Sequence, residues 1–207
     1  EVNERMRELA LKMPVGSTVL TVVRLVEQMA LYYNQTKSIG TLKLNTPEDY
    51  VQKYVNEYYL MDMFYRRALE AYHELVTLDI PIEAVINEAK RQLDQEYAKM
   101  ANVMNLEWLT CVKEKGEAFR GVTLGRQQNF YRTEGDGTVK QVVIVSDALR
   151  YEAAVELMQQ LAKEKHIATL TPYLAMLPTE TKYCKPALLP HQSLELQDTD
   201  MLVDGII

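Results

Sequence analysis

Between Thr46 and Lys115 the chain carries apolar and aromatic residues three or four positions apart, the spacing that places them on one face of an α-helix. The pattern opens at Thr46-Pro47-Glu48-Asp49, which offers an N-cap hydroxyl, a proline for the first helical position and acids for the first turn. We therefore predict a helix from Pro47 to about Leu78. Its stripe consists of Tyr50, Tyr54, Tyr58, Met61, Tyr65, Leu69 and Tyr72.

The same spacing resumes after Asp79-Ile80-Pro81, whose proline interrupts the first helix. It predicts a second helix, from Pro81 to Lys115, antiparallel to the first. Stripes rich in tyrosine and methionine pack inside one molecule more often than they bind a partner, although both uses are open. The second stripe consists of Ile82, Val85, Ile86, Ala89, Leu93, Tyr97, Met100, Met104 and Trp108.

The first 45 residues also show helical spacing, in the stretches Val2 to Met13 and Ser17 to Asn34. Pro14-Val15-Gly16 separates them, and its two helix breakers predict a turn. We expect a helical hairpin here, followed by a polar loop from Thr36 to Asn45.

Past Gly121 the pattern changes to loops and β-branched runs. Val139 to Val145 predicts a buried strand, because its only charged residue is Lys140. A helical pattern follows from Ala148 to Lys165, then a second strand pattern from Ile167 to Leu177 and a short apolar stretch that ends at Pro190. This order predicts a parallel β-α-β unit. The expected fold is an α-helical region (1–120), a linker (121–138) and an α/β region (139–207).

Two polar residues follow the predicted strands. Asp147 comes directly after the first strand and Thr181 comes shortly after the second, at strand ends where α/β proteins hold cations and phosphates. Each residue alone is better explained as a helix cap. Spacing therefore leaves both readings open.

Composition excludes several classes of protein. The 207 residues carry a formal charge of -6, which argues against broad nucleic-acid binding, and no apolar run reaches the roughly 20 residues of a membrane span. The two cysteines, Cys111 and Cys184, are too few for a disulfide framework, so we expect a reducing cytoplasm. A small molecule or a protein is the expected substrate.

Two segments taken together carry a resemblance to a known family. Val142 to Glu152 and Leu177 to Thr181, the latter followed by Ala187-Leu188-Leu189-Pro190-His191, closely resemble the PglZ phosphatases of BREX anti-phage systems. The likeness extends upstream, through Tyr54 to Tyr59, Asp62, Tyr65-Arg66 and Gln127 to Tyr131, to the helical region that precedes the catalytic domain in those proteins.

The resemblance implies the start of an alkaline-phosphatase-like sheet and a site for two divalent metal ions, with zinc as the expected metal. By its pattern Asp147 is a metal ligand, and Thr181, rather than Thr179, is the nucleophile that also contacts metal. Arg150 is a candidate for binding substrate phosphate, although pairing with an acid of its own helix is the better expectation. Cys184 is expected to be a small buried thiol.

Further Asp and His ligands of this superfamily have no counterpart up to Ile207, and the chain has only three histidines, His73, His166 and His191. We therefore expect an inactive fragment, truncated at its C-terminus, of a phosphoesterase that works with other BREX subunits. The alternative is a catalytically silent scaffold that docks partners through its helices.

Overall fold

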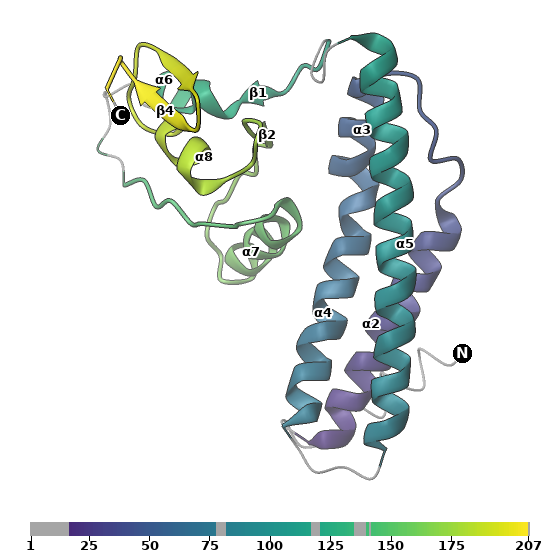
Figure 1. Cartoon of the computed structure of the whole chain (residues 1–207). Coiled ribbons are helices and arrows are strands. Elements are labelled where there is room, and N and C mark those ends of the chain that lie inside the picture. The colour runs from purple at the N-terminus through teal and green to yellow at the C-terminus, as the bar shows by residue number, and fades with distance from the viewer. Residues whose placement is uncertain (1–16, 78–81, 117–120, 135–139, 141, 207) are drawn as a thin grey trace. The chain divides into compact units, whose positions relative to one another are not determined.

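The computed structural model describes residues 17–77, 82–116, 121–134, 140 and 142–206. The chain divides into two compact units, Glu1–Val122 and Thr123–Ile207. Figure 1 shows long helices in the first unit and short helices and strands in the second. Within the described residues, no helix is both long and apolar enough to cross a membrane.

The described residues of the first unit form three long helical rods (Figure 1). They are α2 (Thr18–Ser38), the continuous run of α3 (Pro47–Lys53), the π-helix η1 (Tyr54–Tyr58) and α4 (Tyr59–Val76), and finally α5 (Glu83–Lys115). The Tyr65 hydroxyl donates to Asp94 and the Tyr72 hydroxyl donates to Asn87. The later residue on α4 thus contacts the earlier residue on α5, as in an antiparallel pair. The predicted antiparallel pair is therefore confirmed.

Local chemistry sets the helix boundaries, as predicted for Pro47. The Asp49 N–H donates to Thr46 Oγ1 at 3.2 Å and the Thr46 N–H donates to Asp49 Oδ2 at 3.0 Å, so the two residues form a reciprocal capping box. Gly116 ends α5 at φ 86°, a left-handed conformation that glycine adopts without strain. The predicted helix from Ser17 is confirmed as α2, and it continues through the start of the expected loop to Ser38.

Other parts of the helical prediction fall outside the described residues: the stretch Val2 to Met13, the turn Pro14 to Gly16, and residues 78–81 between α4 and α5.

The core of this unit lies between α2, α4 and α5. Ala68, Ala71 and Leu75 on α4 have no exposed surface, and α4 packs along α2. Small buried side chains on α4 allow a neighbouring helix to approach closely. The cluster contains Leu25, Tyr32, Ile39, Tyr58, Met61, Ala68, Ala71, Leu75, Ile86 and Leu93.

The second unit is built from short elements. In chain order they are β1 (Gly125–Arg126), the 3-10 helix η2 (Gln127–Asn129), α6 (Phe130–Glu134), α7 (Tyr151–Lys163), β2 (Tyr173–Leu174), α8 (Thr181–Ala187), β3 (Leu194–Gln197) and β4 (Asp200–Val203). β1 pairs in parallel with β2, and β3 forms an antiparallel hairpin with β4. Residues 125–134, which we expected to lie in a linker, thus form elements of this unit.

The side chain of Gln127 connects two of these elements and the segment after β2. Gln127 Nε2 donates to the Cys184 carbonyl at 3.1 Å, and the Met176 N–H donates to Gln127 Oε1 at 3.0 Å. The amide therefore links η2 to α8 and to the segment after β2, and it fixes the path of the chain that leads to Thr181.

The predicted buried strand from Val139 to Val145 is wrong over its described part. Residues 142–146 form neither strand nor helix, and Val142 and Ile144 are 83% and 86% exposed. A strand needs a hydrogen-bonded neighbour, and within residues 142–206 nothing pairs with this run. The parallel partner of β2 is β1 instead, so the expected β-α-β unit is not formed. The second predicted strand is confirmed only at Tyr173–Leu174.

Candidate functional site

Asp147 and Thr181 lie in contact within the second unit. The Thr181 hydroxyl donates a hydrogen bond to Asp147 Oδ1 at 3.2 Å, and Oδ2 lies 3.4 Å from the same hydroxyl. The two residues are 34 positions apart, so the contact depends on the fold. Both side chains are exposed and open to a ligand from solvent.

The backbone before α7 holds the Asp147 carboxylate in place. Ala148 has φ 55°, in the left-handed region, and its N–H donates to Asp147 Oδ1 at 3.0 Å. The helix itself begins at Tyr151 with Arg150 as its N-cap residue. Asp147 therefore lies before the cap position and does not cap α7, which removes the simplest structural explanation for its place in the sequence.

Thr181 is the first residue of α8, and Glu180 holds the N-cap position without a side-chain cap. The Thr181 hydroxyl is directed to Asp147 rather than to the backbone of its own helix. Helix capping thus explains neither residue. Lys182, the next residue, donates from Nζ to the Thr199 carbonyl at 3.3 Å, and a hydrogen bond with Tyr183 raises the pKa of its amine.

Arg150 pairs with an acid of its own helix. Its Nε and Nη2 donate to Glu152 Oε1 at 2.9 and 2.7 Å, and Glu152 is fully buried. A buried carboxylate needs such a partner, because removing a charge from water is costly. Arg150 thus has the expected pairing, and its contact with substrate stays a prediction. The sequence indicated an acid of the same helix as the partner of Arg150, and Glu152 lies two residues after it.

Cys184 is a half-buried thiol whose Sγ lies 3.7 Å from the carbonyl oxygens of Met176 and Pro178. Burial raises the pKa of this thiol, and the hydrogen bond with Met176 opposes the shift. A raised pKa keeps the sulfur protonated and weakens it as a nucleophile or metal ligand. This environment agrees with a structural role in packing.

The carboxylate of Asp147 and the hydroxyl of Thr181 are oxygen donors of the kind that divalent cations bind. A protein metal site commonly uses three or more side chains. In the described part of the chain, no group of three or more His, Cys, Asp or Glu side chains could hold a metal ion. The two residues fit as members of a larger ligand set, and alone they do not form a metal site.

Residues 128–207 match the family model of the BREX system PglZ alkaline phosphatase-like domain. Alkaline phosphatase-like protein BrxZ of Escherichia coli O9:H4 (strain HS) is 42% identical over 91 residues, which cover 39% of this chain and 10% of that protein. Alkaline phosphatase-like protein PglZ of Bacillus cereus (strain H3081.97) is 27% identical over 158 residues, or 73% of this chain and 18% of that protein. No solved structure shows a significant match.

The chain thus spans less than a fifth of either curated relative. The 158 residues aligned with the Bacillus protein outnumber those of the second unit, so the similarity extends into the helical unit. The resemblance seen in the sequence is confirmed: residues 128–207 are similar to the BREX system PglZ alkaline phosphatase-like domain, and the chain aligns with part of two curated alkaline phosphatase-like proteins.

Proposed function

We propose that this chain is part of a metal-dependent phosphoesterase of a BREX anti-phage system, in which Thr181 is the nucleophile and Asp147 a metal ligand. The observation that supports the proposal is the contact between the Thr181 hydroxyl and the Asp147 carboxylate at 3.2 Å. It joins the two residues that the family resemblance selected. Neither side chain serves as a helix cap, so both are available for chemistry.

The proposed reaction proceeds in two steps. Thr181 Oγ1 attacks the phosphorus of a phosphoester, so that an O–P bond forms to threonine while the ester bond to the alcohol breaks. The hydroxyl proton of Thr181 passes to solvent, and the departing alkoxide takes up a proton to leave as the alcohol. Water then attacks the phosphothreonine, which releases phosphate or a monoester and restores the hydroxyl. Asp147 holds the Thr181 hydroxyl in position for the first step by accepting its hydrogen bond.

We propose that two divalent metal ions, with zinc as the expected metal, complete the site in the whole protein. Such ions make a weak hydroxyl more acidic and neutralise charge on the phosphoryl group. Asp147 and Thr181 would contribute two ligands, and the remaining ligands would come from outside residues 1–207. On this proposal the 207-residue chain alone is inactive, and Arg150 reaches substrate only by leaving Glu152.

The test uses the full-length protein and a chromogenic phosphodiester. We expect Thr181→Ala to lower the rate at least about a thousandfold, since removing a nucleophile removes the covalent route. Thr181→Ser should keep part of the activity because it keeps a hydroxyl. Thr179→Ala, two residues away, is the matched control and should stay near the unsubstituted rate. Equal rates for Thr181→Ala and Thr179→Ala would contradict the proposal.

Metal content tests the role of Asp147 separately. Asp147→Ala in the full-length protein should bind less metal than the unsubstituted protein, as measured by elemental analysis of dialysed samples. Asp198→Ala, an exposed acid of the β3–β4 turn, is the control. Equal metal content in all three proteins would remove Asp147 from the site.

A second candidate is a catalytically silent scaffold that acts through its helices. The exposed apolar residues Val103, Leu106 and Leu109 on α5 favour it, because exposed apolar side chains on one helix can form a surface for a partner. Metal-free full-length protein that still supports phage resistance would select this candidate. In either case we propose other BREX subunits as partners and the cytoplasm as the location.

A further inference from the structure

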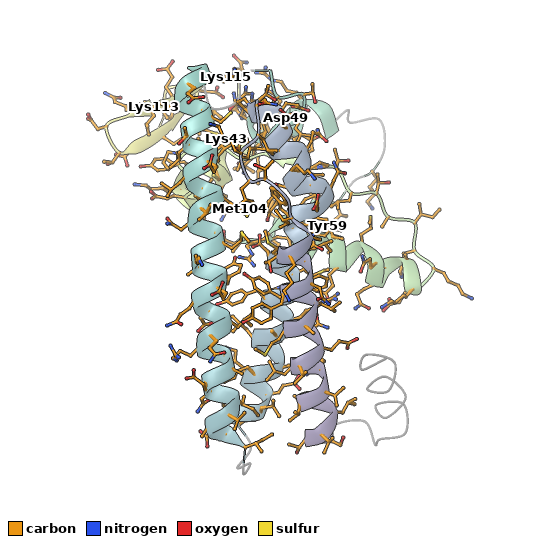
Figure 2. The ribbon with its side chains drawn as sticks, turned by 90° about the vertical axis from the view of Figure 1, so that its right-hand side faces the viewer. Lys43, Asp49, Tyr59, Met104, Lys113 and Lys115 are labelled. Carbon is orange, nitrogen blue, oxygen red and sulfur yellow. The ribbon has the colours of Figure 1, made fainter. Side chains whose placement is uncertain are left out.

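The described part of the helical unit contains a partly open cavity of about 230 Å³ between α2, the α3–η1–α4 run and α5. It is far larger than the roughly 10 to 15 Å³ that one water molecule needs. Met104 in Figure 2 marks the level along α5 at which it lies. Asn105 at its wall is exposed, so the cavity can be reached from solvent. The lining residues are Tyr32, Tyr54, Met61, Asp62, Tyr97, Met100, Ala101, Met104 and Asn105.

A carboxylate held by two phenols lies in the wall of this cavity. The Tyr54 hydroxyl donates to Asp62 Oδ2 at 2.7 Å, and the Tyr97 hydroxyl donates to Asp62 Oδ1 at 2.8 Å. In the described part of the helical unit, Asp62 takes part in no ion pair. Its negative charge is thus oriented by neutral donors, which leaves a favourable place for a cation.

The hydroxyl of Tyr32 is a second sign of a missing ligand. Tyr32 is 1% exposed, lines the cavity, and its hydroxyl oxygen is buried without a hydrogen-bond partner. A buried polar group without a partner is uncommon in folded proteins, because it loses its hydrogen bonds to water and gains none. A ligand with an N–H group in the cavity would supply the partner.

The backbone is irregular at the same place. The rod that carries Tyr54 and Asp62 changes to a π-helix over Tyr54–Tyr58, one end of which lines the cavity. π-Helical turns are rare and are frequent at functional sites, where they change the direction of side chains. Here the wide turn is the one that supplies Tyr54 as a donor to Asp62.

We propose that this cavity binds a primary alkylammonium ion. Its ammonium group would lie against Asp62 and donate a hydrogen bond to the Tyr32 hydroxyl. Tyrosine rings favour cations at their faces, and the methionine side chains of Met61, Met100 and Met104 provide an apolar surface for the alkyl part. A neutral alcohol of the same length lacks the charge that Asp62 selects.

The test measures binding of n-butylammonium to the 207-residue chain by titration calorimetry at neutral pH, with 1-butanol as the neutral counterpart. We expect the ammonium ion to bind at least about tenfold more tightly than the alcohol, the factor that loss of a hydrogen bond to a charged group commonly costs. Equal affinities, or no binding of the ammonium ion, would overturn the proposal.

Asp62→Asn removes the charge and keeps the shape, and we expect it to weaken n-butylammonium binding about tenfold or more. Asp94→Asn is the matched control, because Asp94 also accepts a tyrosine hydroxyl, from Tyr65 at 3.0 Å, and does not line the cavity. The control should bind like the unsubstituted chain. Equal losses in the two variants would contradict the assignment.

Tyr32→Phe separates ligand binding from a structural role. It deletes a buried hydroxyl that has no partner, so we expect the thermal midpoint of the free protein to stay the same or rise. Affinity for n-butylammonium should nevertheless fall. A variant with unchanged affinity would remove Tyr32 from the site and overturn the proposed contact.

Discussion

The helical unit and the second unit differ in whether one segment can form its own backbone hydrogen bonds. A helix forms its backbone hydrogen bonds within one segment, and α2, α4 and α5 then bury a common core. A strand needs a neighbour, and in the second unit β1 and β2 are two-residue strands while residues 142–145 stay exposed. The helices of the first unit thus share a buried core, whereas the apolar run before Asp147 pairs with no strand of the described residues.

The largest expected difference in the free energy of unfolding is between a substitution in the helical core and one in the exposed run at 142–145. Leu75 on α4 is fully buried, so Leu75→Ala should lower the free energy of unfolding by about 2 to 5 kcal/mol. Ile144→Ala, at a side chain that is 86% exposed, should change it by less than about 0.5 kcal/mol. Urea titrations followed by circular dichroism measure both. A large loss from Ile144→Ala would show that the run is packed in solution.

Within the second unit, the Arg150–Glu152 pair should matter most. Arg150→Ala leaves the buried Glu152 carboxylate without its guanidinium partner, and we expect a loss of about 1 to 3 kcal/mol. Lys163→Ala, at the exposed end of the same helix, is the control. The readout is the unfolding transition of this unit, followed by the NMR signals of α7. Equal stability of the two variants would mean that the pair is not formed.

Helix caps give a smaller contrast between the units. Thr46→Ala removes half of a capping box and should cost about 1 kcal/mol in the helical unit. Thr179→Ala, before α8, removes no cap, and should leave stability within about 0.5 kcal/mol of the unsubstituted chain. Thermal unfolding of both variants tests the difference. A similar loss in each would show that Thr179 caps α8 in solution.

The smallest effect is a pH dependence in the β3–β4 hairpin. The N–H groups of Ser193 and Gln192 donate to Asp204 Oδ1 at 2.8 and 2.7 Å and lower the pKa of this carboxyl. A lowered pKa stabilises the folded hairpin above the ordinary Asp pKa of about 3.9, and that stability is lost as the pH falls through the folded-state pKa. NMR shifts of the two amides should follow this titration, and Asp204→Asn should abolish it.

The difference between the units also explains what the sequence could predict. The helix from Pro47 could be predicted because its start depends on Thr46 and Asp49, which are neighbours in the sequence. The strand predicted at 139–145 is wrong over its described part, because β-branched residues indicate only a preference and a strand exists only beside another strand. The parallel partner of β2 comes from Gly125–Arg126, a pair of residues without any strand pattern.

The family resemblance selected Asp147 and Thr181, and their roles in a site stay predictions. Spacing alone favoured a helix cap for each residue, and whether either caps a helix depends on where α7 and α8 begin. Ala148 has a left-handed conformation, and α7 begins only at Tyr151. The local sequence does not indicate this later helix start. The place of Asp62 in the helical cavity could not be predicted from the sequence either, because Tyr32, Asp62 and Tyr97 come together only when three helices pack.

The most direct test of the role of Thr181 is to identify which residue of the full-length protein carries phosphate during turnover. The protein is mixed with an excess of phosphodiester, stopped with acid after a few turnovers, digested, and its peptides are sequenced by mass spectrometry. We predict phosphate on Thr181, and none in Thr181→Ala. Phosphate on Thr179 instead, or full hydrolysis by Thr181→Ala, would contradict the assignment of Thr181 as the nucleophile beside Asp147.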